Sequence, residues 1–456
     1  MRASTSAVAV PTTWDVFGLA WPMTLKAIML HGIVVIDAYL VSPLGEPALA
    51  ALGLAGAVAG LLLGVLLSFA NATQIRIAQA YGGGDPVFLK SALYSGMAIS
   101  LSICAVGLLA LGAGGGHLLD ALAHDPWIAQ EARRYLTVFA IVIAAEAVGQ
   151  CLSSYFNGTG NTRIPLFGYM IGVPVNVVVS LIFINGWLGV PAMGVVGAAI
   201  GSATGALLQA GFLTYSVLRR TGAYRHVIGW RNGTFAASVK RHLGFAAPIA
   251  ATFISATVAS NVCMLLYARL GVNEFAAMTL IMPWIMVAGT FGMSWAQATG
   301  IYVAQMLGRN VSGDALDAFL AGAWRAAVVA AGLVALFYMT ICALSPWIYP
   351  DLHAETLATF VGYWPILLLL PFPKGSNAIC GNTLRAAGET VYVMHVFVWS
   401  QWLFRVPATA ILILYFDVPA FWVLAVLLLE ELVKFPAFHL RLIRGDWKRA
   451  ALLDLG

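Results

Sequence analysis

Two carboxylates inside long apolar segments are the residues of this sequence best suited to chemistry. Asp37 follows the apolar run 32–36, and Glu146 lies in a second apolar stretch. Keeping a carboxylate at membrane depth is costly, so such residues usually mark functional sites. A carboxylate that must be neutralised by a proton or by Na⁺ can couple ion movement to a conformational equilibrium. We interpret Asp37 as the leading candidate; the alternative is a structural aspartate near a helix end, solvated from outside.

Glu146 has a cation at the equivalent position of the second half of the chain. It lies 228 residues before Lys374, and neighbouring residues recur at the same offset. These opposite charges could pair across a cavity, line it separately, or form a structural salt bridge. Uncharged candidates are Asn176 and Ser180, which are four residues apart and share one helix face, and Ser202 in the next apolar segment. These three residues complete the candidate cation site.

Motifs that would indicate other chemistry do not occur in the sequence. The run 82–85 lacks the lysine of a GxxxxGKS/T phosphate-binding loop, and neither GxSxG nor HExxH is present. The five cysteines lie in apolar segments without a CxxC pair, so no disulfide framework or zinc site is indicated. We expect no enzyme activity, no catalytic or metal-binding residues, and no cofactor beyond a coupling ion, H⁺ or Na⁺.

Apolar segments long enough to cross a bilayer recur along the whole chain. The sequence is 61% hydrophobic and 9% charged, with a mean hydropathy of +0.88, which lies outside the range of soluble domains. A hydrocarbon core of about 30 Å requires roughly 20 apolar residues per helix. We predict an all-α polytopic membrane protein with twelve transmembrane helices, at residues 14–42, 47–76, 90–116, 131–156, 163–186, 192–218, 240–268, 274–306, 316–345, 355–384, 391–415 and 419–441.

Part of the N-terminal half recurs in the C-terminal half at a constant offset of 226 residues. Six helices per copy give both halves the same orientation, which predicts two six-helix bundles related by a parallel internal repeat. The predicted domains are an N-terminal lobe at 1–218, a basic cytoplasmic connector at 219–241, and a C-terminal lobe with a cytoplasmic tail at 242–456. The recurring pairs include Gly18/Gly244, Pro22/Pro248, Leu44/Leu270, Gly45/Gly271, Ser68/Ser294, Thr73/Thr299, Gln79/Gln305 and Gly82/Gly308.

Prolines and glycines add expectations about helix shape and packing. Pro22 and Pro248 are repeat partners in the first helix of each half, where a proline removes a backbone hydrogen bond and permits a kink. We predict that both prolines act as hinges. Glycines four residues apart let helix backbones approach closely in a membrane. We expect such packing for two series, Gly56, Gly60 and Gly64, and Gly197, Gly201 and Gly205.

The basic residues are distributed unevenly among the predicted loops. About 18 of the 24 lysines and arginines lie in the N-terminal segment, the even-numbered loops and the C-terminal tail. This asymmetry follows the positive-inside rule and predicts a multi-pass protein of the cytoplasmic (inner) membrane with both termini in the cytoplasm. Nucleic-acid binding would need a basic face with base-stacking partners, which the sequence does not supply.

Four ordered segments carry a resemblance to a known family. The stretches 36–39 (Ile-Asp-Ala-Tyr) with 44–45 (Leu-Gly), 158–163 (Gly-Thr-Gly-Asn-Thr-Arg), 174–176 (Pro-Val-Asn) and 194–199 (Gly-Val-Val-Gly-Ala-Ala) resemble those of multidrug and toxic compound extrusion (MATE) transporters. The resemblance covers essentially the whole chain. It implies two six-helix bundles, alternating access, and cation-driven export of drugs or metabolites.

The resemblance also implies roles for single residues. Asp37 matches the family's aspartate in the first helix, Pro22 its proline there, and Asn176 its asparagine in the fifth helix, while Ser202 falls where a hydroxyl residue is common. The sequence departs at Ser180, where members with an N-lobe cation site usually have a second aspartate. It also lacks the helix-7 glutamate and helix-10 aspartate of another branch. These departures favour protons over Na⁺.

Two functions remain open from the sequence. The first is efflux of small, cationic, amphipathic molecules by a monomeric antiporter that uses H⁺ or Na⁺. The second is a flippase for a lipid-linked or amphipathic substrate, whose cavity should carry cations for a phosphate group; Lys26, Lys374 and Arg405 are the candidates. An enzyme or a structural scaffold is disfavoured by the repeat and by the lack of a catalytic constellation.

Overall fold

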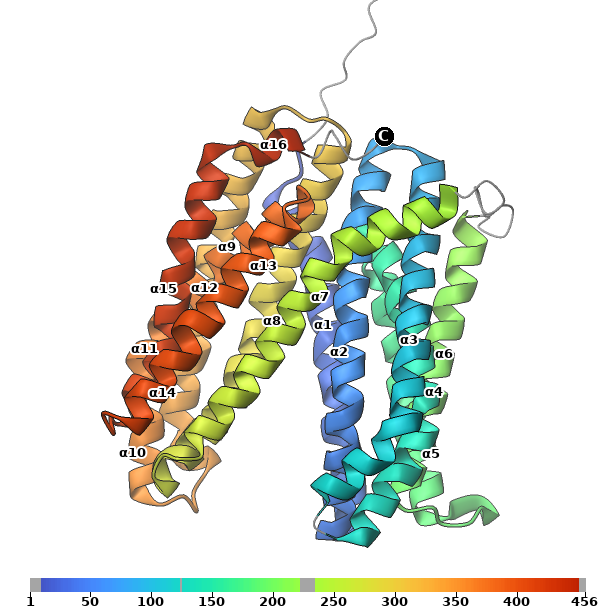
Figure 1. Cartoon of the computed structure of the whole chain (residues 1–456), viewed down its shortest axis with the longest axis vertical. Coiled ribbons are helices and arrows are strands. Elements are labelled where there is room, and N and C mark those ends of the chain that lie inside the picture. The colour runs from blue at the N-terminus through green and yellow to red at the C-terminus, as the bar shows by residue number, and fades with distance from the viewer. Residues whose placement is uncertain (1–9, 124, 222–233, 451–456) are drawn as a thin grey trace, which may run out of the picture. The chain divides into compact units, whose positions relative to one another are not determined.

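Helices make up nearly all of the chain (Figure 1). A computed structural model describes residues 10–123, 125–221 and 234–450, and these contain no β-strand. All twelve predicted segments are helical. The first nine are α1 (Thr13–Val41), α2 (Glu46–Gly83), α3 (Pro86–Leu122), α4 (Pro126–Gly158), α5 (Arg163–Asn185), α6 (Val195–Thr221), α7 (Thr234–Tyr267), α8 (Val272–Gly308) and α9 (Gly313–Ile348).

The last three predicted segments are interrupted or polar. The tenth consists of α10 (Ala354–Gly362), α11 (Trp364–Leu369) and α12 (Pro371–Ala386). The eleventh consists of α13 (Thr390–Trp399), a π-helical turn (Ser400–Arg405) and α14 (Val406–Leu414). The twelfth is α15 (Ala420–Arg444), and the short α16 (Trp447–Ala450) follows it. Short 3₁₀ turns, Ser42–Leu44 and Trp187–Gly189, lie in two of the loops.

Length and apolarity qualify most of these helices as membrane spans. Within the described residues, 10 helices are long and apolar enough, or 11 if the pair bent by 45° at Leu370 counts as one span. α15 falls outside this count because Glu430, Glu431 and Lys434 lie near its centre. The all-α polytopic fold class is thus confirmed, and the chain is a multi-pass membrane protein.

Local sequence explains where two long helices begin. Asp85 accepts hydrogen bonds from the backbone N–H groups of Val87 and Phe88, and Asp125 accepts one from Trp127. A proline follows each aspartate at the first helical position, where a missing N–H costs nothing. The same Asp-Pro device therefore starts both α3 and α4.

The described residues group into two compact units. The N-terminal unit comprises residues 25–81, 85–123, 125–221 and 234–247, and the C-terminal unit comprises residues 10–24, 82–84 and 248–450. The division runs through α1 just after Pro22 and through α7 just before Pro248. The lobes predicted at 1–218 and 242–456 remain a prediction, and residues 222–233 of the predicted connector lie outside the described residues.

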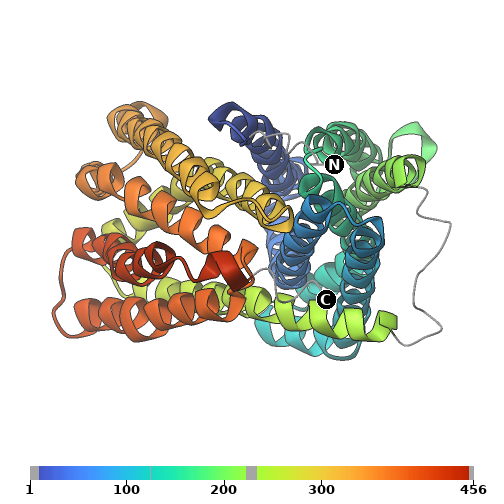
Figure 2. The same ribbon diagram turned by 90° about the horizontal axis from the view of Figure 1, so that it is seen from above.

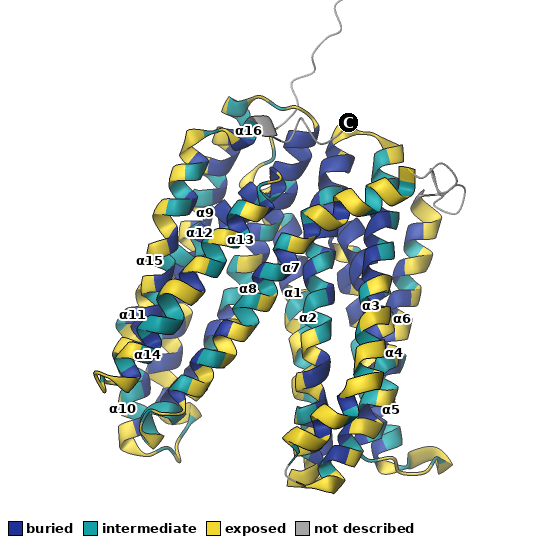
Figure 3. Cartoon of the chain, viewed as in Figure 1, coloured by how far each residue is buried: buried dark blue, intermediate teal, exposed yellow. Residues whose placement is uncertain are grey.

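Each unit has buried residues along its helices, interspersed with exposed ones (Figure 3). The buried set is mainly apolar, and many exposed residues are large and apolar as well. In the N-terminal unit, α3 packs on α4, and α6 packs on both α4 and α5, side by side (Figures 1 and 2). One core cluster there surrounds Val41, Ala51 and Tyr135. In the C-terminal unit one core cluster surrounds Met278 and Phe360. All five cysteines are buried and free.

Glycines allow α5 and α6 to touch through their backbones. A Cβ atom on Gly205 would lie 2.7 Å from the carbonyl oxygen of Gly172, and one on Gly172 would lie 2.8 Å from that of Gly205. The predicted packing role of the α6 glycine series is confirmed at this contact. On α2 the same spacing has another use: Gly56 and Gly60 have no neighbouring atom within 4 Å of such a Cβ position, and both line a cavity.

The first segments of α1 and α7 are each built into the unit that holds most of the other half of the chain. At the start of α1, the backbone oxygen of Asp15 accepts a hydrogen bond from Tyr302 at 3.4 Å. At the start of α7, buried His242 contacts the hydroxyl groups of Ser95 at 2.8 Å and Thr73 at 3.2 Å. Residues 10–24 therefore complete the C-terminal unit, and residues 234–247 complete the N-terminal unit.

Candidate functional site

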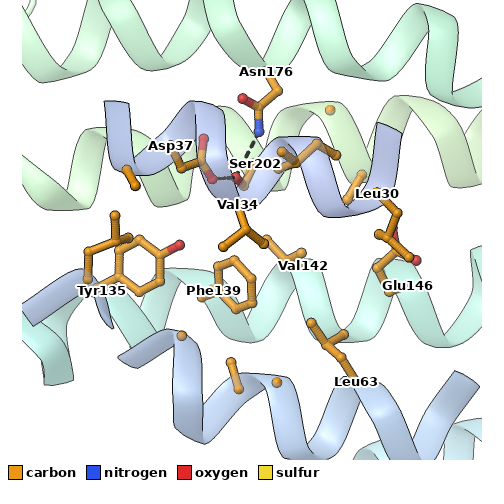
Figure 4. Close-up of a pocket in the computed structure, with 18 of the residues that line it drawn as sticks. Leu30, Val34, Asp37, Leu63, Tyr135, Phe139, Val142, Glu146, Asn176 and Ser202 are labelled. Atoms are coloured by element: carbon orange, nitrogen blue, oxygen red, sulfur yellow. Dashed lines mark hydrogen bonds between the residues drawn. The ribbon is translucent and has the colours of Figure 1, made fainter. Parts of the chain in front are cut away.

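A cavity of about 470 Å³ lies inside the N-terminal unit, between α1, α2, α4, α5 and α6 (Figure 4). Most of its wall is apolar, with Leu30, Val34, Leu63, Phe139 and Val142 among the lining side chains. The polar groups come from four helices, and they are Asp37, Tyr135, Glu146, Tyr169, Asn176, Ser202 and Gln209. A wall of this composition and a volume of this size suit a small organic molecule.

Three of the predicted site residues form one hydrogen-bonded chain. Ser202 on α6 donates to Oδ2 of Asp37 on α1 at 2.8 Å, and the side-chain amide of Asn176 on α5 donates to the Ser202 hydroxyl at 2.8 Å (Figure 4). Asp37 is only 3% exposed. In both hydrogen bonds the donor hydrogen is directed toward the carboxylate end of the chain, from Asn176 to Ser202 and from Ser202 to Asp37. This arrangement stabilises a negative charge in an apolar site.

Two oxygen atoms of this chain have no hydrogen-bond partner. Oδ1 of Asp37 and Oδ1 of Asn176 are buried and unsatisfied. A buried acceptor without a partner is costly, which makes such an atom a place where a proton or a cation gains stability. The unpartnered oxygen of Asp37 is therefore an atom of the site that can accept a proton or a cation.

Ser180 is placed differently from the other three candidates. Its hydroxyl group is also buried without a hydrogen-bond partner, but the side chain faces Gly201 across the α5–α6 contact. Ser180 is not among the residues that line the cavity. The four-residue spacing from Asn176 placed both residues on one side of α5, but it could not indicate that α6 would cover the second one.

Glu146 lines the same cavity and belongs to a second polar cluster, which extends behind the cavity wall. Gln150 donates from its amide to Glu146 at 2.8 Å and to the hydroxyl of Tyr169 at 2.9 Å. Lys26 on α1 donates to the amide oxygen of Gln150 at 3.3 Å. A lysine and a carboxylate are thus linked through one amide. In Figure 4, Asp37 and Glu146 lie toward opposite ends of the pocket.

Sequence reasoning missed Gln150 and Tyr169 as parts of this cluster. The available signal was the i,i+4 spacing of Gln150 from Glu146, which brings both side chains together on one face of α4. Tyr169 carried no comparable signal, because its contact with α4 depends on how α5 packs against it. The sequence also did not relate Lys26 to Glu146.

Lys374 lies in a different cavity from Glu146. It is on α12 and lines a pocket of about 60 Å³ in the C-terminal unit, together with residues of α8 and α9. Each member of the pair at offset 228 therefore lines a cavity of its own unit. The roles predicted for the two opposite charges at one shared cavity stay predictions.

The two predicted hinge prolines lie inside α1 and α7. A proline leaves the carbonyl four residues earlier without its helical partner and crowds it. In both helices that earlier residue is a glycine, Gly18 before Pro22 and Gly244 before Pro248. A Cβ atom on either glycine would have no neighbour within 4 Å, and the hinge role of the two prolines stays a prediction.

Family comparison identifies the class of protein. The MatE family model matches the chain twice, at residues 22–182 and 248–411. The chain belongs to the MATE family. The two matched stretches of this MATE protein begin 226 residues apart, at the paired prolines. This start confirms the repeat offset read from the sequence.

Similar proteins cover nearly the full chain. The probable multidrug resistance protein NorM of Rhizobium meliloti is 26% identical over 411 residues, which span 84% of this chain and 85% of that protein. The protein of the same name from Deinococcus radiodurans is 26% identical over 400 residues, again 84% and 85% of the two chains. Among solved structures, the eukaryotic MATE transporter AtDTX14 superposes with a TM-score of 0.83 at 18% identity, covering 96% of this chain and 97% of that chain. The last likeness concerns the fold.

Proposed function

We propose that this MATE-family chain is a secondary active exporter of small molecules that works by alternating access and antiports H⁺ through Asp37. One observation carries the proposal: a nearly fully buried carboxylate lines a cavity large enough for a small organic molecule and keeps one oxygen without a hydrogen-bond partner. The names of the relatives, probable multidrug resistance proteins, support export of drug-like compounds.

The chemistry of coupling follows from the hydrogen bonds of Asp37. Ser202 holds Oδ2 of the ionised carboxylate, with Asn176 behind it, and leaves Oδ1 available to accept a proton. Protonation removes a negative charge from an apolar cavity and so changes the relative free energies of the two access states. When a cationic substrate and a proton compete for the same negative charge, binding of one favours release of the other.

A proton suits this site better than Na⁺. Hard metal cations take several oxygen ligands at once, whereas in the hydrogen-bonded chain of Asp37, Ser202 and Asn176 only Oδ1 of Asp37 and Oδ1 of Asn176 lack a partner. The hydroxyl of Ser180, where the resemblance suggests a second aspartate, is directed to the α5–α6 contact. Na⁺ remains the alternative coupling ion, and separate ion gradients distinguish the two.

The cavity wall indicates the kind of molecule transported. Apolar and aromatic side chains surround the two carboxylates, Asp37 and Glu146. Such a wall favours an amphipathic cation, because aromatic faces and carboxylates both attract positive charge. We assign Glu146 and Lys374 to substrate recognition and Pro22 and Pro248 to bending of α1 and α7. We further propose a monomer in the cytoplasmic (inner) membrane with both termini in the cytoplasm, as the basic loops predict.

Transport measured in everted membrane vesicles tests this function. A fluorescent lipophilic cation is offered under an imposed pH gradient or an imposed Na⁺ gradient, to wild type and to Asp37→Asn. We expect uptake driven by the pH gradient in wild type and at least a tenfold lower rate in the variant, because an amide cannot bind and release the coupling proton (roughly the scale of general acid–base effects). Asp120→Asn, at an exposed ion pair with Arg133, is the matched control.

Each of the other outcomes would contradict one part of the proposed function. Undiminished gradient-driven uptake by Asp37→Asn would remove Asp37 from the mechanism. Uptake driven by Na⁺ alone would replace the proton as coupling ion. If neither gradient drives uptake by the wild type, translocation of a fluorescent phospholipid becomes the measurement, and its presence would support the flippase.

A further inference from the structure

A lysine without an acidic partner marks the small pocket of the C-terminal unit. Within the described residues, the ammonium group of Lys374 donates no hydrogen bond and forms no ion pair, although it lines the pocket. The Lys374 side chain is half-buried, and an ammonium group that is partly removed from water gains stability when an acceptor binds it. The pocket thus contains a donor group with nothing in the described chain to satisfy it.

Two carboxylates of the same unit whose charges act on Lys374, Glu430 and Glu431, are already paired with other cations. Glu430 is bonded by Arg405 at 3.4 Å and by Lys434 at 3.3 Å, and Glu431 is bonded by Lys434 at 2.8 Å. This cluster therefore combines three cations with two carboxylates. One positive charge is left over, and it belongs to the residue that faces the pocket.

Other polar groups of the pocket wall are satisfied within the chain. Tyr338 donates its hydroxyl hydrogen to the carbonyl of Ile285 at 3.3 Å, and the indole of Trp295 donates to the carbonyl of Ala323 at 3.2 Å. The rest of the wall is mostly glycine, alanine and other apolar residues. Among the described side chains, Lys374 alone supplies an available donor to this space.

The size of the pocket limits what can bind there. A volume of about 60 Å³ is far below the roughly 300–1,000 Å³ of pockets that hold drug-sized ligands, so the pocket suits a small group such as a carboxylate and not the body of such a molecule. Glycine makes this room: a Cβ atom on Gly289 would lie 3.6 Å from the Lys374 nitrogen. The ligand chemistry is therefore a compact, planar anion on a larger molecule.

We propose that Lys374 binds a carboxylate of the transported molecule, so that the exporter prefers compounds carrying both a cationic and an acidic group over purely cationic ones. This substrate class rests on the proposed function. The pocket selects the acidic group by one charge-assisted hydrogen bond to the ammonium. Neutralising the acid, as in an ester, removes that bond and leaves the ammonium without a partner.

A matched pair of probes isolates the acidic group. A rhodamine with a free carboxylate and the methyl ester of the same rhodamine are compared for transport in everted vesicles and for binding to purified protein by fluorescence anisotropy. The measured quantity is the acid-to-ester ratio. We expect Lys374→Gln to lower this ratio roughly ten- to a hundredfold, the range of one hydrogen bond to a charged group. Lys374→Arg keeps the charge and should retain most of the preference.

Two further variants guard against misfolding and general charge effects. Gly289→Ala leaves the lysine in place but puts a methyl group beside its nitrogen, and we expect a smaller drop in the ratio. Lys90→Gln removes a lysine at the start of α3, far along the chain from the pocket, and should leave the ratio unchanged.

The outcomes separate this inference from the proposed function. An unchanged ratio in Lys374→Gln, or equal loss of acid and ester, overturns the carboxylate site even if transport depends on Asp37. Bound phospholipid that is lost from Lys374→Gln in native mass spectrometry, without a change in the ratio, also overturns it and assigns the lysine to a lipid phosphate. If wild type transports neither probe but binds the acid in a Lys374-dependent manner, the site stands and the transport function fails.

Discussion

At the scale of single residues, Ser202 is the link that organises the cation site. Its hydroxyl group accepts from Asn176 and donates to Asp37, so it joins α5, α6 and α1 through two bonds of 2.8 Å. A residue in the middle of such a chain fixes the orientation of both neighbours. The position of the carboxylate therefore depends on a small neutral side chain.

Replacing Ser202 tests this dependence. Ser202→Ala removes the donor to Asp37 and the acceptor for Asn176, and a hydrogen bond to a charged group is worth about 1.5–3 kcal/mol. We expect the rate of gradient-driven export to fall by roughly tenfold or more in vesicles, whereas Ser202→Thr keeps the hydroxyl and should retain most activity. Equal rates in the two variants would show that the hydroxyl is dispensable.

The sequence could predict the members of this site but not every contact. Asp37 was identifiable because a lone carboxylate in an apolar run is costly. Asn176 and Ser202 were polar candidates in other apolar segments, and the family resemblance supported both. The cluster around Glu146 was different. Lys26 and Gln150 are 124 residues apart in the chain, and their meeting depends on the rotation of α1 relative to α4. Periodicity defines a helix face but does not say which helix will cover it.

At the scale of elements, α5 and α6 form the support on which the site rests. They approach so closely that backbone atoms of Gly172 and Gly205 occupy the space of each other's missing side chains. The glycine series on α6 predicted this contact, because membrane helices pack closely through small residues. The identical spacing on α2 instead borders the cavity. Spacing alone could not separate these two uses, since both need a helix face without side chains.

A methyl group at Gly205 should therefore weaken the fold. Gly205→Ala places a Cβ atom 2.7 Å from the carbonyl oxygen of Gly172, and overpacking of this kind costs about 1–3 kcal/mol. We expect a lower midpoint of thermal unfolding in detergent, followed by tryptophan fluorescence. Gly211→Ala on the same helix has no atom within 4 Å of the new methyl group and should unfold at or above the wild-type temperature. A Gly205→Ala midpoint equal to that of Gly211→Ala would contradict the close contact.

At the scale of the whole molecule, the chain repeats its scaffold but not its charges. The paired prolines and glycines and the two family matches follow the repeat. Asp37 and Glu146, in contrast, have Cys263 and Lys374 at the equivalent positions. The duplication was readable from sequence because backbone devices recur in register. The sequence could not predict that residues 10–24 belong to the C-terminal unit and residues 234–247 to the N-terminal unit. The repeat is equally compatible with helices that stay within their own half.

Membrane orientation is open to a direct chemical test. The five native cysteines are buried, so a membrane-impermeant maleimide should label wild type only weakly and report on single engineered cysteines. Leu188 is 87% exposed in an odd-numbered loop, and Arg309 is exposed in an even-numbered one. We expect Leu188→Cys to react in spheroplasts and Arg309→Cys to react only in everted vesicles. The reverse pattern would invert the proposed topology.

The first segment of α1 belongs to the C-terminal unit and the first segment of α7 belongs to the N-terminal unit, and this exchange has a consequence for the origin of such a chain. Neither half carries all the parts of one compact unit, since residues 10–24 serve the C-terminal unit and residues 234–247 serve the N-terminal one. An ancestral protein of six helices would have been complete only as a pair of identical chains that traded these segments, in the manner of a domain-swapped dimer. Gene fusion would then have made the trade internal, after which each half was free to acquire its own charges.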